Sequence, residues 1–230
     1  MPEPPLVRPY RGVAAADRVA SRREALIDAA LEVFAESGWD ALSARRICEH
    51  AGLARRYFYE SFDDLDALIA ATHERITVAV RAAMLAAIAE GPAPLAELAG
   101  RALSAALDVM AVPRSNGRFF MLAQSRGTPM PHEARALDDL AAIAEGVLST
   151  HPAIAKQIAP HDARITAVIL VGAVRSLIDT WLAQTTALSR DEVISWSVSA
   201  ILGIIDAATA RGQRPPTGGQ SGWYQKYDPF

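Results

Sequence analysis

Residues 43–62 read SARRICEHAGLARRYFYESF, and the order of capping, apolar, small and basic residues in this stretch predicts a helix-turn-helix. Ser43 is a good N-cap for a short helix over 44–50, and a second short helix follows over about 54–61. The turn between them is Ala51-Gly52-Leu53, where Gly52 accepts the positive φ angle that a tight turn requires.

The inner faces of the two short helices carry the residues that allow the helices to pack closely where they cross. Ile47 points inward from the first helix, and Leu53 and Phe58 close the core from the second. Cys48 and Ala51 are small, which lets the helices approach closely. Cys48 is the single cysteine of the chain, and we interpret it as a small buried filler rather than a redox switch.

The outer faces carry arginines and tyrosines. The first residues of a second helix laid in the major groove face base edges, and Arg55 and Arg56 hold that position. Arginine can give two hydrogen bonds to guanine, while Ser43 and the N–H groups behind it suit a phosphate. An alternative is a solvated face on which Glu49 and Glu60 pair with the arginines. The surrounding core favours DNA binding, and the predicted DNA-binding residues are Ser43, Ala44, Arg45, Arg46, Ala54, Arg55, Arg56, Tyr57 and Tyr59.

Upstream of this motif, the sequence predicts one amphipathic helix. Ser21 and Glu24 form an S-x-x-E capping box, apolar residues then recur at helical spacing, and Gly38 ends the helix. Residues 1–20 contain four prolines and several arginines, so we expect a flexible arm there. The predicted DNA-binding domain therefore covers residues 21–66.

Downstream of the motif, the pattern remains helical, and the chain is predicted to be all-α. A long helix opens near Phe62 and ends at Gly91-Pro92, and proline-punctuated apolar helices follow up to residue 211. Residues 67–211 are predicted to form a larger helical domain. The expected helices are 94–111, 115–126, 131–149, 152–158, 162–186 and 190–211. Residues 212–230 are rich in Gly and Pro and form either a loose tail or a strap on a partner subunit.

Composition limits the classes of function. The chain has 230 residues and a formal net charge of -3, so nucleic-acid binding must come from a local basic patch. We expect a cytoplasmic protein, because the N-terminus lacks the apolar segment of a secretion signal. The longest apolar run, Ile165 to Val174, is too short to span a bilayer, so no membrane partner is expected.

No set of residues indicates an enzyme. The sequence has no G-x-S-x-G, H-E-x-x-H or phosphate-binding glycine loop, and its histidines are scattered. We therefore predict no catalytic residues, no cofactor and no metal site. A small-molecule pocket and an ordinary core are equally good interpretations of the middle region. The candidate pocket residues are Met84, Phe119, Phe120, Met121 and Gln124.

The last two predicted helices are apolar around most of their circumference, which is typical of helices that are buried on two sides. One side can then face a partner subunit. Arg175 and Asp179, four residues apart, must be paired in such a helix and mark either a dimer seam or the floor of a pocket. We favour the seam, and the predicted interface residues are Arg175, Asp179, Trp181, Trp196, Ile201 and Ile205.

The stretch from Arg23 to Ala71 resembles the N-terminal domain of the tetracycline-repressor (TetR) family. It covers about a fifth of the chain, and the C-terminal part is similar only in length and helical layout. The positions that carry the resemblance are Phe34, Gly38, Trp39, Ser43, Ile47-Cys48, Ala51-Gly52-Leu53, and Tyr59 with Phe62.

The resemblance implies a homodimer joined by a four-helix bundle of the last two helices. It also implies a ligand pocket between the middle helices and a repressor that an effector releases from palindromic DNA. Arg56 and Tyr57 replace the family's usual Gly and Thr, so the operator should differ from those of better-known members. Leu65 replaces the usual Lys, which removes a common phosphate contact. An activator, a regulator without a ligand, and a helical scaffold or enzyme with a protein-binding motif remain alternatives.

Overall fold

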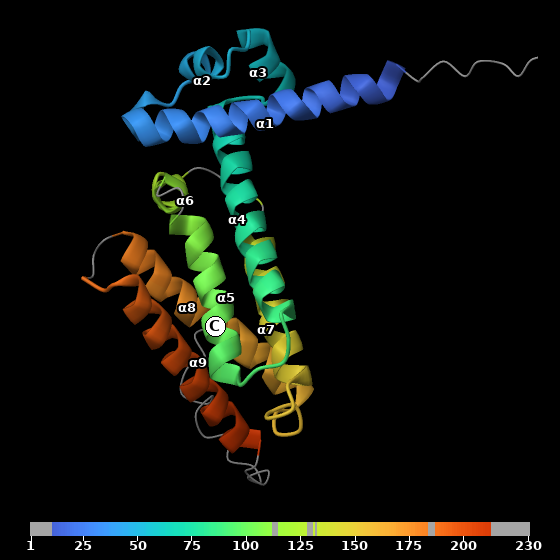
Figure 1. Cartoon of the computed structure of the whole chain (residues 1–230), viewed down its shortest axis with the longest axis vertical. Coiled ribbons are helices and arrows are strands. Elements are labelled where there is room, and N and C mark those ends of the chain that lie inside the picture. Colours follow the sequence, from blue (N-terminus) through green and yellow to red (C-terminus); the bar gives the residue numbers. More distant parts are fainter. Residues whose placement is uncertain (1–10, 112–114, 128–130, 132, 184–186, 213–230) are drawn as a thin grey trace, which may run out of the picture.

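The computed structural model describes residues 11–111, 115–127, 131, 133–183 and 187–212. All regular structure in these residues is helical, which confirms the predicted fold class (Figure 1). The elements are α1 (Arg11–Ser37), the 3₁₀ turn η1 (Trp39–Ala41), α2 (Ala44–His50), α3 (Arg55–Ser61), α4 (Leu65–Ala89), α5 (Leu95–Ala111), α6 (Ser115–Ser125), α7 (Glu133–Thr150), α8 (Pro160–Leu182) and α9 (Arg190–Gly212).

The first three helices form a small head at one end of the molecule. In Figure 1, α1 crosses this end, and α2 and α3 pack on its outer side. Gly38 and Gly52 have φ angles of 80° and 65°, so the two turns that shape the head need glycine, as the sequence predicted. Ile47 and Phe58 are fully buried between the helices, and Cys48 is buried beside them.

Helix α1 begins at Arg11, so the predicted start at Ser21 is wrong, and residues 11–20 are helical rather than a flexible arm. The segment 12–20 contains several alanines and no proline, its one glycine is Gly12 in the first turn of the helix, and alanine has the highest helix propensity. Ser21 and Glu24 therefore lie inside a continuing helix, where a capping box has no free N–H groups to satisfy. Residues 1–10 lie outside the described residues.

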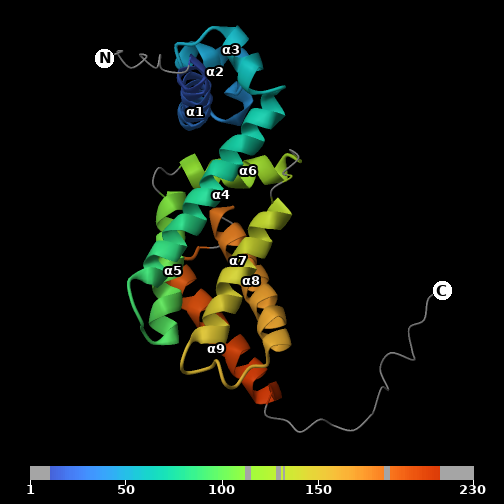
Figure 2. The same ribbon diagram turned by 90° about the vertical axis from the view of Figure 1, so that its right-hand side faces the viewer.

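A body of six helices follows, and α4 joins it to the head (Figure 2). The side chain of Asp64 caps α4 by accepting a hydrogen bond from the Ala67 N–H at 2.7 Å. Helices α4, α5, α7, α8 and α9 pack lengthwise, and α6 lies across the top of the body. Residues 152–158, predicted as a helix, form turns over 152–157 and a bend at 158 instead, because only six residues lie between Pro152 and Ala159 before Pro160 starts α8.

One hydrophobic core runs through the head and the upper body. Phe119 of α6 is fully buried and packs edge-on against Phe34 of α1, with ring centroids 5.3 Å apart. Its ring also lies 5.5 Å from that of Trp39. At the surface of the same junction, Arg126, in the turn directly after α6, pairs with Asp40 of η1 at 3.4 Å. Helix α6 is therefore packed against the head as well as the body.

Helices α8 and α9 leave large apolar side chains exposed. Ile165, Val168 and Ile169 on α8 are 46 to 51% exposed, and Trp196 on α9 is 63% exposed. Both helices are long and apolar enough to cross a membrane by length and composition alone, a test that helices of soluble proteins also pass. The uninterrupted apolar run from Ile165 to Val174, on which the sequence-based expectation of no membrane partner rests, is shorter than either helix. The packing of the described residues leaves these apolar side chains of α8 and α9 uncovered.

Candidate DNA-binding surface and ligand cavity

The start of α2 is capped as the sequence predicted. The hydroxyl of Ser43 accepts a hydrogen bond from the Arg46 N–H at 3.2 Å, which fixes the direction of the first turn. Ser43 is exposed, and the half-buried Ala44 follows it. The remaining N–H groups of this turn point outward with Ser43 toward any anion that approaches the helix end.

Helix α3 presents its first turn to solvent. It begins at Arg55, after the N-cap residue Ala54, so Arg55 and Arg56 occupy the N-terminal position that the sequence predicted. Both side chains are exposed, and in the described part of the chain neither has a carboxylate partner within ion-pair distance. The arginines that were expected to face base edges therefore form no ion pair with Glu49 or Glu60.

Two tyrosines of α3 hold these arginines. Nη2 of Arg55 donates to the hydroxyl of the exposed Tyr59 at 3.3 Å. Nη2 of Arg56 donates to the hydroxyl of Tyr57 at 2.6 Å, and this hydrogen bond raises the pKa of Arg56 above its usual value. The tyrosines restrict the rotamers of two long side chains before any DNA is bound, which lowers the entropy cost of binding.

Tyr57 lies between two arginines, and only one of them belongs to its own helix. The guanidinium carbon of Arg56 lies 4.6 Å from the ring centroid, and that of Arg22 from α1 lies 4.5 Å from it. Arg22 also pairs with Glu60 at 3.6 Å. Tyr57 is half-buried, so the structure places it as a packing contact between α1 and α3 rather than on the fully exposed face.

The two arginines of α2 are engaged with the protein itself. Nε of Arg45 donates to the carboxylate of Glu49 at 2.8 Å, and this interaction raises the pKa of Arg45. Nη2 of Arg46 donates to the hydroxyl of Ser37 at 2.6 Å. The alternative of an ion-paired surface therefore holds for Arg45. Burial raises the pKa of the nearby Cys48 thiol, in agreement with its interpretation as a filler.

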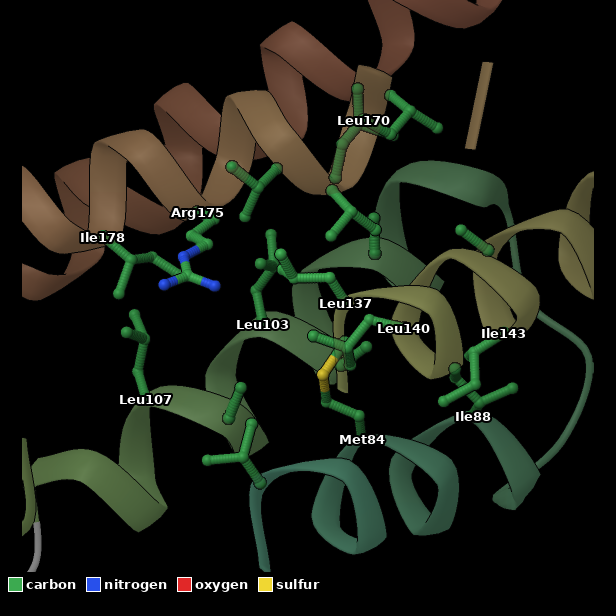
Figure 3. A pocket seen from close by; sticks show the side chains of 18 of the residues that line it. Met84, Ile88, Leu103, Leu107, Leu137, Leu140, Ile143, Leu170, Arg175 and Ile178 are labelled. Carbon is green, nitrogen blue, oxygen red and sulfur yellow. The ribbon is translucent and has the colours of Figure 1, made fainter. Parts of the chain in front are cut away.

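A cavity of about 220 Å³ lies within the body. Helices α4, α5, α7 and α8 supply most of its lining, with α6 and α9 at its borders, and nearly all of that lining is aliphatic (Figure 3). A second cavity of about 120 Å³ between α4 and α7 is bordered by Glu74, Arg81, Arg135 and Asp139. The two cavities share Thr77, Ala136 and Leu140, so the apolar cavity borders a polar recess at this side.

The predicted pocket residues separate into two groups. Met84 and Phe120 line the cavity, as the pocket interpretation required. Phe119 is buried against the head instead, because adjacent residues of a helix point about 100° apart. Met121 and Gln124 are not among the described residues that line the cavity. Gln124 lies behind it, with its Nε2 3.1 Å from Nε2 of His73.

The sequence pattern missed His73 as a cavity residue. Its ring is 1% exposed and stacks on that of Phe120 at 4.1 Å between centroids, and both residues line the cavity. Among the residues that the structure describes, no group of three or more His, Cys, Asp or Glu side chains is arranged to hold a metal ion.

Most of the residues predicted for the dimer interface do not lie on an exposed face of the chain. Arg175, Asp179, Ile201 and Ile205 line the cavity, and Ile205 is only 3% exposed, so it has no surface left for a partner. Nε1 of Trp181 donates to the carbonyl of Leu188 at 3.0 Å. Trp196 does lie on the exposed apolar surface. The sequence missed Ile165, Val168 and Ile169, although their spacing places them on one face of α8.

Comparison with known proteins matches both parts of the chain. Residues 26–72 match the family described as bacterial regulatory proteins, tetR family. No curated protein matches the sequence of this chain.

Three solved structures illustrate the similarity of fold. The fatty acid degradation regulator FadR from Bacillus halodurans has a TM-score of 0.62 and 13% identity over 79% of this chain and 94% of that one. A TetR-like transcriptional regulator from Rhodococcus sp. RHA1 has a TM-score of 0.56 and 22% identity over 80% and 94%. FadR from Bacillus subtilis in complex with stearoyl-CoA has a TM-score of 0.56 and 19% identity over 79% and 97%.

Proposed function

This chain belongs to the TetR family of DNA-binding transcriptional regulators, and we propose that it is a homodimeric repressor that a small-molecule effector releases from a palindromic operator. The observation that carries the proposal is the exposed first turn of α3, where Arg55 and Arg56 have no carboxylate partner among the described residues. Such a protein acts where the chromosome lies, in the bacterial cytoplasm.

Sequence would be read mainly by α3. In a helix-turn-helix, the N-terminal residues of the second helix reach base edges in the major groove. Arg55 and Arg56 stand at this position, and their guanidinium groups suit guanine. Ser43, Ala44, Arg45 and Arg46 on α2, together with Tyr59, would contact phosphates and set the register without reading sequence.

A homodimer is supported by the exposed apolar side chains of α8 and α9. Ile165, Val168, Ile169 and Trp196 are about half exposed or more in the single chain, and a partner would remove them from water. A two-fold dimer presents two copies of α3, which must be spaced about 34–36 Å apart to occupy successive major grooves. The operator would therefore be a palindrome.

An effector would act through the cavity. The cavity is much larger than the water-sized voids of a close-packed core and borders α6 through Phe120, while the adjacent Phe119 packs on Phe34 and Trp39 of the head. A ligand that displaces α6 or tilts α4 would change the spacing of the two heads. It can act only if it binds the non-DNA-binding spacing more tightly. FadR from Bacillus subtilis has been solved with stearoyl-CoA, which supports a ligand-binding role for the body of this fold.

The test is selection of bound sequences from random duplex DNA, followed by titration of the selected duplex with and without candidate metabolites. We expect a palindromic consensus, a dimeric mass at micromolar concentration, and release by at least one compound that binds the body. A consensus without symmetry, or a monomeric mass, would contradict the homodimer. Weak binding that does not depend on sequence would favour a helical scaffold, and a specific site that no metabolite affects would favour a ligand-independent regulator.

A further inference from the structure

Two arginine–glutamate pairs of the head have the same spacing and order along the chain, but only one of them forms an ion pair. On α2, Nε of Arg45 donates to the carboxylate of Glu49, four residues later, at 2.8 Å. On α3, Arg56 and Glu60 are also four residues apart and exposed, a spacing at which side chains of one helix meet. They nevertheless form no ion pair with each other. Because the spacing is the same, the difference must arise from what surrounds α3.

The neighbour that separates the second pair is Arg22 of α1. Its Nη2 lies 3.6 Å from Oε2 of Glu60, and its guanidinium carbon lies 4.5 Å from the ring centroid of Tyr57. The side chain of Arg22 is only 23% exposed. A guanidinium that already rests on a ring loses less conformational freedom on pairing than one that moves in water. Glu60 therefore pairs with Arg22 and not with Arg56.

Arg56 is held in a different way, by a group without charge. Its Nη2 donates to the hydroxyl of Tyr57 at 2.6 Å, and this hydrogen bond raises the pKa of Arg56 more than the charge of Glu60 does. A tyrosine hydroxyl is neutral at ordinary pH. The positive charge of Arg56 is therefore oriented by its partner but not cancelled by it.

A carboxylate on Arg56 would interfere with the reading of a base. Guanine O6 and N7 take two donors of one guanidinium, and a bound carboxylate takes the same two donors more strongly. Glu60 would first have to be displaced from Arg56, and its charge would then stand close to the phosphates of DNA. Both effects would reduce the preference of Arg56 for one base pair.

We infer that Arg22 of α1 is a specificity-determining residue, because it keeps Glu60 away from Arg56 and so leaves the guanidinium of Arg56 able to read a base pair. Arg22 is a positioning residue, since it acts through Glu60 and Tyr57 and does not have to touch DNA. The inference rests on the proposed function, in which α3 reads the operator sequence.

The experiment compares the unmodified full-length protein with R22M. Affinities are measured at one salt concentration for the duplex selected from random DNA and for its single-base-pair variants, and Arg56→Ala identifies the position that Arg56 reads. Methionine keeps an unbranched chain against the ring of Tyr57 but releases Glu60. We expect discrimination at the Arg56 position to fall about twofold to fivefold, of which one helix ion pair accounts for about twofold and freed rotamers for the rest. Discrimination at other positions should stay unchanged.

The double variant R22M/E60Q separates this role from a structural one. Glutamine carries no charge that could hold Arg56, so the double variant should regain most of the discrimination that R22M loses. E60Q alone should keep the discrimination of the unmodified protein and bind every duplex slightly more tightly, since it removes a negative charge near DNA. If Arg22 only held α1 against α3, E60Q would not relieve its loss.

The matched control is R18A. Arg18 is an exposed arginine one turn before Arg22 on α1, and it forms no ion pair with Glu60. R18A removes the same charge from the same helix, so it should leave discrimination at every position unchanged even where it weakens binding to all duplexes. Thermal unfolding of each variant shows whether it is folded. If R22M does not fold, R22Q takes its place with the same expected results, because its side chain is also uncharged.

The possible results separate the inference from the proposed function. Unchanged discrimination in R22M, or a loss that E60Q does not restore, overturns the role of Arg22. An Arg56→Ala variant that loses affinity equally for all duplexes also overturns it, because Arg56 would then read no base. A protein that selects no sequence contradicts the proposed function and removes the basis of this inference with it.

Discussion

The head and the body of the molecule differ in how each uses arginine. On α3 of the head, Arg55 and Arg56 are exposed, held by tyrosines, and without a carboxylate partner in the described residues. In the body, Arg175 points into an aliphatic cavity and is paired with Asp179. The exposed arginines suit a polyanion in water, whereas the arginine of the body is already engaged with a carboxylate of its own helix. The difference shows that the environment of an arginine determines which partner it can select.

The largest expected effect comes from breaking the link between the two regions. Phe119→Ala removes a fully buried ring that joins α6 to Phe34 and Trp39, and we expect it to lower the free energy of unfolding by about 3–5 kcal/mol. Urea unfolding at fixed protein concentration measures this change. Phe120→Ala, next to it on the cavity side, is partly exposed and should cost less. A loss under about 1 kcal/mol for Phe119→Ala would mean that head and body are independent units.

The next effect tests the exposed arginines as readers of sequence. Arg55→Ala should weaken binding to the selected operator by about tenfold to a hundredfold, and the loss should shrink on duplexes altered at the base pair that Arg55 contacts. Arg55→Lys is the matched variant, since lysine keeps the charge but lacks the planar pair of donors. Titration of a panel of single-base operator variants provides the measurement. The same loss on every duplex would assign Arg55 to phosphate instead.

A smaller effect tests the tyrosine between two arginines. Tyr57→Phe keeps the ring between Arg22 and Arg56 and removes the hydroxyl that accepts from Arg56 at 2.6 Å. We expect unchanged thermal stability and a fewfold loss of discrimination at one operator position, because Arg56 gains rotamer freedom. Tyr57→Leu should also lower stability, since it removes both ring contacts. If Tyr57→Phe weakened binding to all sequences equally, a phosphate contact by the hydroxyl would explain it better.

The smallest effect concerns the arginine of α2 that is already paired. Arg45→Ala should weaken binding to all duplexes alike and reduce the slope of log K against log salt by about one. Glu49→Gln removes the carboxylate that holds Arg45 at 2.8 Å, so it should raise affinity slightly for every sequence. A salt series with both variants distinguishes the two effects. A change that depended on sequence would place Arg45 on a base edge.

The head could be predicted from the sequence because its determinants are local. Ser43 caps its own helix and Gly52 adopts the positive φ of its own turn, so the residues within ten positions specify the geometry. The start of α1 was the exception. A capping box at Ser21 was visible, but the alanine-rich segment before it continues the helix, and a cap pattern cannot act inside a helix.

The cavity could be predicted only in part because its determinants are distant in sequence. Phe119 and Phe120 look alike in the sequence, yet one packs on the head and the other lines the cavity. The pairing of Arg175 with Asp179 followed from their spacing, whereas the side of α8 on which they lie depends on how α7 and α9 pack against it. Hydrophobic periodicity identifies a buried face and does not show what buries it.

The measurement that tests the account most directly compares the selected palindromic duplex with a scrambled duplex of equal length and composition at the same salt concentration. We expect at least a thousandfold higher affinity for the selected duplex, the lower end of what sequence-specific proteins achieve, and a ratio about tenfold to a hundredfold smaller in Arg55→Ala. A ratio within about tenfold would contradict the claim that α3 reads DNA sequence.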